Sequence, residues 1–145
     1  MSAASQVVRE FFDQYVRGRS GLDIDLISSQ YPAAFMMAGP TGARVAEKAS
    51  IHAAFAKGRE LLGALGHKAT TIRRLDETTL DDRYVLVRAQ FAWHFDKPPV
   101  PPTEVVVGST FVLHVDQGTV AIVFQLEHED FPDALRAHGV LPPQR

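Results

Sequence analysis

Cysteine is absent from this chain of 145 residues, which excludes disulfide bonds, cysteine-ligated metals and thiol nucleophiles. No apolar run approaches the roughly 18 residues of a membrane span, and no cationic, apolar export signal precedes the first polar residues. Phosphate loops, dinucleotide fingerprints and HExxH motifs are also missing, so we expect no cofactor and no bound metal. A reducing, cytoplasmic location is the one we expect.

A large excess of one sign of charge is also lacking, because the net charge is -2 and acidic and basic residues are interleaved. Such a surface has no electrostatic footprint for phosphate backbones or anionic lipids, so we expect neither nucleic acid nor a membrane as a partner. The hydrophobic content of 46% is sufficient for a core. A chain of this length buries roughly 70% of its unfolded surface, and we expect one domain over residues 1–145.

Helical spacing of apolar residues dominates the first half of the chain. It predicts a helix over residues 4–17 that ends at Gly18 and a short helix over residues 23–30 that Pro32 closes off. A small hairpin is predicted over residues 35–46, around the turn sequence GPTG. A third helix is predicted over residues 47–65, with Gly66 as its C-terminal cap.

From His67 onward the pattern changes to alternation, which is typical of strands. We predict strands over residues 70–80 and 83–96, then a stiff proline-rich loop over residues 97–102, which could also be interpreted as a PxxP ligand. A long hairpin over residues 104–130 turns at Asp116-Gln117-Gly118, where Gly118 supplies a positive φ. A short helix over residues 131–137 closes the chain.

The register of the long hairpin over residues 104–130 can be predicted if Gln117 and Gly118 form a two-residue turn. Opposite residues on an antiparallel pair share a face. One face would then be almost wholly apolar, pairing Phe111 with Phe124, Leu113 with Ile122, Ser109 with Leu126 and Val107 with His128. The other face is mixed, and contains Gly108, Thr110, Val112 and His114 against Ala121, Val123, Gln125 and Glu127.

Helices at the front and a long meander at the back predict an α+β fold, with helices packed on one face of a curved, mostly antiparallel sheet. Helices on a twisted sheet tend to leave a cavity over its concave middle. Apolar and aromatic side chains would line that cavity, and we expect them to bind a small hydrophobic or aromatic ligand: Phe11, Tyr15, Phe35, Met37, Phe55, Phe91, Trp93, Phe111 and Phe124.

The order of elements resembles the nuclear transport factor two-like superfamily, the cystatin-like α+β cone of SnoaL-like polyketide cyclases, ketosteroid isomerases and scytalone dehydratases. The resemblance covers nearly the whole chain. Its carriers are residues 7–12 (VVREFF), 26–32 (LISSQYP), 42–51 (GARVAEKASI), 116–121 (DQGTVA) and 134–142 (ALRAHGVLP). It implies a pocket inside the cone and a homodimer across the outer face of the sheet, here the mixed face that contains Leu86, Arg88, Gln90, Thr110, Val112, Val123 and Gln125.

Ketosteroid isomerase, a worked case of tuned carboxyl groups, uses an aspartate base with a tyrosine and a protonated aspartate as oxyanion donors. By our alignment, the position of the tyrosine falls on Phe11, that of the aspartate base near residues 37–39, and that of the protonated aspartate on or near Ser109. None of these can act in the required way, so we do not expect that activity. The resemblance to the cyclases and related hydrolases directs attention instead to polar residues on the late strands.

The catalytic candidates are His128, as an acid or base, and Tyr15, as a donor of a hydrogen bond through its hydroxyl. The alternatives are a solvated histidine at a frayed strand end and a packed tyrosine ring with a wet tip. Trp93 either stacks on a flat ligand or fills the core, and Ser109 binds ligand or hydrogen-bonds within the sheet. The acidic and histidine run over residues 127–130 alternates between faces, so we expect no metal site there.

Two hypotheses about function remain. The first is a small-molecule pocket protein, either a carrier or a cofactor-independent cyclase, isomerase, dehydratase or hydrolase acting on an apolar ring compound. The second is a non-catalytic homodimerisation or interaction module with a self-filled core. A cavity near Trp93, Tyr15 and His128 would favour the first hypothesis, and a closed apolar interior would favour the second.

Overall fold

The computed structural model describes residues 2–143 of the chain. Its elements are β1 Ser2–Ala3, α1 Gln6–Gly21, α2 Ile24–Ser29, β2 Ala34–Gly39, β3 Gly42–Glu47, α3 Lys48–Ala64, β4 His67–Thr79, β5 Tyr84–Lys97, β6 Val100–Asp116, β7 Thr119–Glu127 and α4 Phe131–Ala137. The strands of this part of the chain form one sheet in the order β1-β4-β5-β6-β7-β2-β3. The pair β2 and β7 is parallel and the others are antiparallel. The predicted α+β fold is confirmed.

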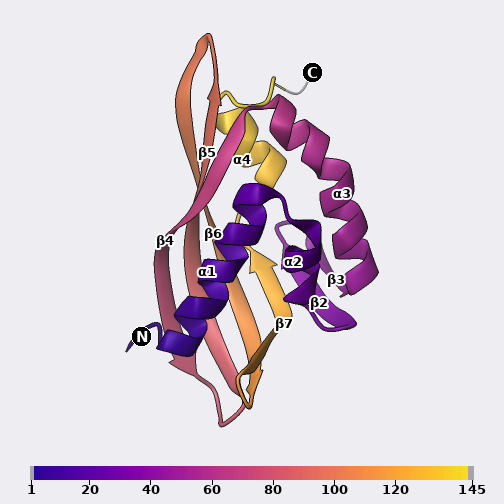
Figure 1. Cartoon of the computed structure of the whole chain (residues 1–145), viewed down its shortest axis with the longest axis vertical. Coiled ribbons are helices and arrows are strands. Elements are labelled where there is room, and N and C mark those ends of the chain that lie inside the picture. The colour runs from indigo at the N-terminus through magenta and orange to yellow at the C-terminus, as the bar shows by residue number, and fades with distance from the viewer. Residues whose placement is uncertain (1, 144–145) are drawn as a thin grey trace.

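Helix α1 lies across the strongly curved sheet, while α2, α3 and the β2–β3 hairpin are grouped beside β7 (Figure 1). The apolar stripe of α1 meets the sheet through aromatic rings. Phe12 lies 4.9 Å from Phe111 between ring centroids, and Tyr15 stacks on Phe91 at 4.8 Å. Both contacts have the separation of favourable aromatic pairs. The helix stripe therefore covers the apolar sheet face, as the sequence predicted.

Helix α1 continues through Gly18, where we expected it to stop, and ends at Gly21 with Leu22 in the left-handed region at φ 50°. Gly18 is needed for close packing instead, because a Cβ there would lie 3.1 Å from the Ile27 side chain. The extra turn contains Arg19, which is buried.

The hairpin between β6 and β7 turns through Gln117 and Gly118 as predicted, with φ values of 50° and 82°. Two positive φ values identify a two-residue turn that matches the twist of the strands. Leu113 pairs with Ile122, also as predicted. The next pair, however, is Val112 with Phe124, so Val123 has no partner in the ladder. Val123 is therefore the extra residue of a β-bulge.

Beyond the bulge the predicted register is wrong. Phe111 pairs with Gln125 and Ser109 with Glu127, in place of Phe124 and Leu126, and the His128 backbone meets Gly108 in place of Val107. Directly opposite residues share a face, and a shift of one residue exchanges the faces. Gln125 and Glu127 therefore face the helices, while Phe124, Leu126 and His128 face outward.

The predicted loop over residues 97–102 is shorter than expected, because β5 reaches Lys97 and β6 already begins at Val100. The hairpin that results projects beyond the rest of the sheet (Figure 1). Among residues 2–143, every helix falls short of the length and apolarity that crossing a bilayer requires.

Candidate functional site

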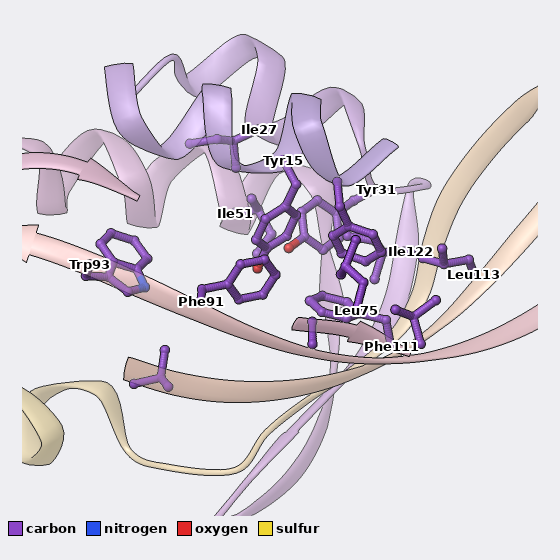
Figure 2. Packing of buried hydrophobic residues seen from close by; sticks show 14 of the residues in the cluster. Tyr15, Ile27, Tyr31, Ile51, Leu75, Phe91, Trp93, Phe111, Leu113 and Ile122 are labelled. Carbon is purple, nitrogen blue, oxygen red and sulfur yellow. The ribbon is translucent and has the colours of Figure 1, made fainter. Parts of the chain in front are cut away.

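A cleft of about 670 Å³ opens between α1, α3, the β2–β3 turn and the inner face of the sheet. Its walls are mostly apolar and include Ile51, Phe55, Leu62, Phe91, Trp93, Val107 and Leu135. Trp93 stands apart from the tightly packed rings of Tyr15, Phe91 and Tyr31 (Figure 2). The volume lies within the range of small-molecule sites in proteins, about 300–1,000 Å³.

One side of the cleft is a chain of buried and half-buried polar side chains. Arg19 Nη2 donates to the Tyr31 hydroxyl at 3.1 Å, and that hydroxyl donates to Gln125 Oε1 at 2.5 Å. The Gln125 amide donates to the Tyr15 hydroxyl at 3.4 Å and to one oxygen of Glu127. The other Glu127 oxygen accepts from Ser109 Oγ at 2.8 Å. We call these six residues the polar floor, and all of them line the cleft.

The direction of each bond in the polar floor is fixed by its two ends. Arginine only donates and an ionised glutamate only accepts. Tyr31 must therefore pass its hydrogen to Gln125, whose amide hydrogens then point toward Tyr15 and Glu127. The hydroxyl hydrogen of Tyr15 has no acceptor among the described residues. It is available to a ligand in the cleft.

Burial controls the ionisation of both tyrosines. It raises the pKa of Tyr15 well above the usual value of 10.0, and the Arg19 cation opposes that rise only in part. Burial raises the pKa of Tyr31 as well, again against the effect of Arg19. Both hydroxyls therefore stay protonated at neutral pH, so Tyr15 acts as a hydrogen-bond donor and not as a base.

Six of the predicted site residues line the cleft: Tyr15, Met37, Phe55, Phe91, Trp93 and Ser109. The other predicted wall residues lie elsewhere. Phe111 is fully buried in the core, and Phe35 packs on the far side of Tyr31 at 4.5 Å between centroids. Phe11 is half-buried at the edge of α1, where its ring meets Phe12. Phe111 and Phe35 therefore support rings that line the cleft without lining it themselves, whereas Phe11 packs on Phe12 in the core.

The predicted positions of His128 and Phe124 in the cavity are wrong, because the bulge at Val123 turns both side chains to the outer face of the sheet. His128 is exposed and its Nε2 lies 2.7 Å from Thr110 Oγ1. It borders a second, smaller cavity of about 280 Å³ on that face, together with Arg74 and Arg88. His128 therefore cannot act in the main cleft. The same shift takes Gln125, 4% exposed, out of the predicted dimer face and into the interior.

Sequence reasoning missed Arg19, Tyr31, Gln125 and Glu127 as site residues. A signal for Arg19 was present, because it continues the helical spacing of Val8, Phe12 and Tyr15 by one more turn. No comparable signal existed for Gln125 and Glu127. The run over residues 120–124 is apolar at every position, so its alternation does not reveal an extra residue.

Near the apolar end of the cleft, His67 packs beside Trp93 with ring centroids 5.1 Å apart. Its Nε2 lies 3.0 Å from Thr70 Oγ1. Desolvation lowers the pKa of His67 below the usual 6.5. This histidine is therefore neutral at physiological pH and serves as part of the packing around the tryptophan.

Comparison with known proteins gives structural relatives only, since no family profile and no curated protein matches the sequence. An NTF2-like protein with a cystatin-like fold from Novosphingobium aromaticivorans superposes with a TM-score of 0.72 at 15% identity, over 95% of this chain and 88% of that one. ActVI-ORFA from Streptomyces coelicolor gives 0.69 at 12% identity, over 85% of this chain and 95% of its own. A ketosteroid isomerase-like protein from Erwinia carotovora atroseptica gives 0.62 at 16%, over 84% and 92%.

These similarities define the class of fold. The chain has the NTF2-like, cystatin-like α+β fold, with helices packed on a curved, unclosed sheet, and the resemblance predicted from the sequence is confirmed at that level. At identities this low the likeness concerns the fold, and a fold hosts many functions. Function must be argued from the cleft itself.

Proposed function

We propose that the protein binds an apolar ring compound in the main cleft. The observation that carries this proposal is the combination of aromatic walls with the convergent polar floor. Ligand sites in proteins are typically apolar cavities with a few placed polar groups that fix orientation. Trp93 and Phe91 offer flat faces to a ring, and Tyr15 offers a hydroxyl hydrogen to an acceptor on it.

The alternative, an interaction module with a self-filled core, is not favoured. Such a module has no use for a cavity of about 670 Å³ beneath its helices. It also gives no reason to keep charged and amide groups buried, since burying them is costly unless every partner is present. The structural neighbours, which include a ketosteroid isomerase-like protein, are consistent with a ligand-binding fold.

If the protein is an enzyme, the proposed reaction is a proton transfer without a cofactor, of the cyclase, isomerase, dehydratase or hydrolase kind. Glu127 replaces His128 as the candidate acid or base, because its carboxylate borders the cleft between Gln125 and Ser109. Tyr15 would donate to the ligand oxygen that gains charge when the proton leaves. The substrate's acidic C–H or O–H would therefore lie between these two groups.

Binding is testable through Trp93, the one tryptophan in the chain. A ring compound that enters the cleft should change Trp93 fluorescence, and it should raise the melting temperature as its concentration increases above the Kd. Val107→Phe should abolish both effects, because Val107 is 6% exposed and lines the cleft. Val106→Phe is the matched control, because Val106 precedes Val107 on the same strand, lies on the opposite face of the sheet and is 37% exposed. Equal ligand responses in both variants would reject the cleft as the site.

We also propose that the outer sheet face forms a homodimer. This face presents Val106 together with half-buried Val112, Phe124 and Leu126, and polar groups such as Thr110 lie among them. A mixture of this kind is typical of an interface between subunits. The expected face therefore keeps Leu86, Arg88, Gln90, Thr110 and Val112 and loses Gln125.

A further inference from the structure

Arg19 is buried in the cleft wall without a carboxylate partner. It is 3% exposed and lines the main cleft. Every ion pair within residues 2–143 involves other cations. Arginine is almost never fully buried unless it is paired, because the charge must otherwise be removed from water without compensation. The described residues therefore supply no counterion for the Arg19 cation.

Two aromatic rings and two hydrogen bonds hold the Arg19 side chain. Its Cζ lies 3.3 Å from the centroid of the Tyr15 ring and 5.2 Å from that of Phe55. Nη1 donates to the Tyr15 carbonyl at 3.4 Å and Nη2 to the Tyr31 hydroxyl at 3.1 Å. A guanidinium has five N–H donors. Stacking and two bonds hold it in place, but most of its donor capacity is unused.

The Nε atom of Arg19 has no hydrogen-bond partner among the described residues, because the two bonds of this side chain use Nη1 and Nη2. Arg19 is also one of the residues that line the main cleft. A second free donor, the Tyr15 hydroxyl hydrogen, borders the same space.

The acidic residues that line the cleft are already occupied by the protein. Glu127 accepts from Gln125 and Ser109, Glu129 accepts from the Gly108 N–H at 2.9 Å, and Asp130 accepts from the Asp133 N–H at 3.0 Å as the cap of α4. Each carboxylate thus has donors of its own. Tyr15 and Arg19, in contrast, have donor hydrogens without an acceptor among the described residues, and Arg19 is a buried cation.

From these observations, and resting on the proposed ligand-binding function, we propose that the ring compound bound in the cleft carries an oxyanion that pairs with Arg19. A carboxylate or an ionised ring hydroxyl has the required charge and acceptor geometry. The apolar part of the ligand then lies along Phe91 and Trp93. Such a ligand supplies the missing counterion, whereas a neutral ring would leave the cation unpaired.

The test compares a charged probe with its neutral isostere. By titration calorimetry at neutral pH, 4-tert-butylbenzoate should bind the wild type at least about tenfold more tightly than 4-tert-butylbenzamide, as a charge-assisted bond in a desolvated site allows. Arg19→Met should abolish this preference and keep the affinity for the amide. Arg17→Met removes the same charge from an exposed position on the same helix and should keep the preference.

Equal binding of the two probes to the wild type, or a preference that survives Arg19→Met, would overturn the inference while leaving the proposed binding of ring compounds intact. Binding of neither probe would reject both. If Arg19→Met does not fold, a measurement on the wild type alone still tests the inference.

Bound 4-nitrophenol should ionise at lower pH than the free compound, because a nearby cation stabilises the phenolate. The absorbance of the phenolate measures this ionisation. An unchanged or raised pKa of the bound phenol would contradict a cationic site.

Discussion

Replacing Gln125 with leucine tests the register of β7, on which the whole polar floor depends. The Gln125 side chain is 4% exposed, accepts from Tyr31 at 2.5 Å and donates to Tyr15 and Glu127. Leucine fills a similar volume but offers no polar atom. The Tyr31 hydroxyl would then lose its acceptor inside the protein, and Glu127 would lose one donor.

The expected loss of stability can be worked out from these contacts. A buried hydroxyl without its partner costs about 1–3 kcal/mol. Glu127 is only half-buried, so water replaces part of its lost bond and the cost there is about 1 kcal/mol. The added apolar burial by leucine returns about 1 kcal/mol and offsets that second cost. We therefore expect a net loss of about 1–3 kcal/mol in the free energy of unfolding. For a domain of this size, the melting temperature would fall by roughly 3–9 °C.

Urea denaturation of matched variants measures this loss. Gln14→Leu is the control, because Gln14 is exposed on α1, away from the proposed dimer face, and its replacement should change stability by less than about 0.5 kcal/mol. A double-mutant cycle adds a second readout. In a Tyr31→Phe background the orphaned hydroxyl is gone, so Gln125→Leu should cost less than it does alone. If Gln125→Leu behaves like Gln14→Leu, the bulge and the inward direction of Gln125 are refuted.

Three further predictions concern titration and assembly. Because burial lowers the pKa of His67 below 6.5, the wild type should lose stability relative to His67→Gln as the pH falls through that value, while the difference between the two proteins should stay constant above it; urea denaturation at several pH values would measure this. Burial raises the pKa of Tyr15 and Tyr31 above 10.0, so their contribution to stability should persist below that pH and be lost as the pH rises through the raised values. A spectrophotometric titration should accordingly show late-ionising phenols that disappear in the two phenylalanine variants. Sedimentation should give about twice 16.0 kDa for the wild type and 16.0 kDa for Val112→Arg, whereas a wild-type monomer at micromolar concentration would reject the dimer.

The fold was largely predictable because its signals are local. Helical spacing gives way to alternation near His67, and the turns carry the residues that their backbones need. Gly66 is one example, since it has φ 83° and a Cβ there would lie 2.7 Å from the Asp96 carbonyl oxygen. Gly118 is another, with φ 82° in the turn between β6 and β7. At both positions the positive φ favours glycine, which is the residue present in the sequence.

The cleft was predictable only in part. Its apolar walls follow from alternation on β5, where Phe91 and Trp93 are directed inward as expected. The polar floor depends on two features that alternation does not report. One is the last turn of α1, which carries Arg19 past a glycine that usually ends a helix. The other is the bulge at Val123, which leaves no trace in a continuous apolar run.

The bulge decides what kind of interior this sheet encloses. In an unbroken ladder, Phe124 and Leu126 would point at the helices, and Gln125 and Glu127 would lie outside, leaving Arg19 and Tyr31 without polar neighbours on the sheet. One additional residue exchanges the two faces over the last part of β7 and directs an amide and a carboxylate toward the buried arginine and tyrosines. Both groups are satisfied there, which makes their burial tolerable. The extra residue thus converts an apolar core position into the polar side of a cleft, and it does so without changing the composition of the strand.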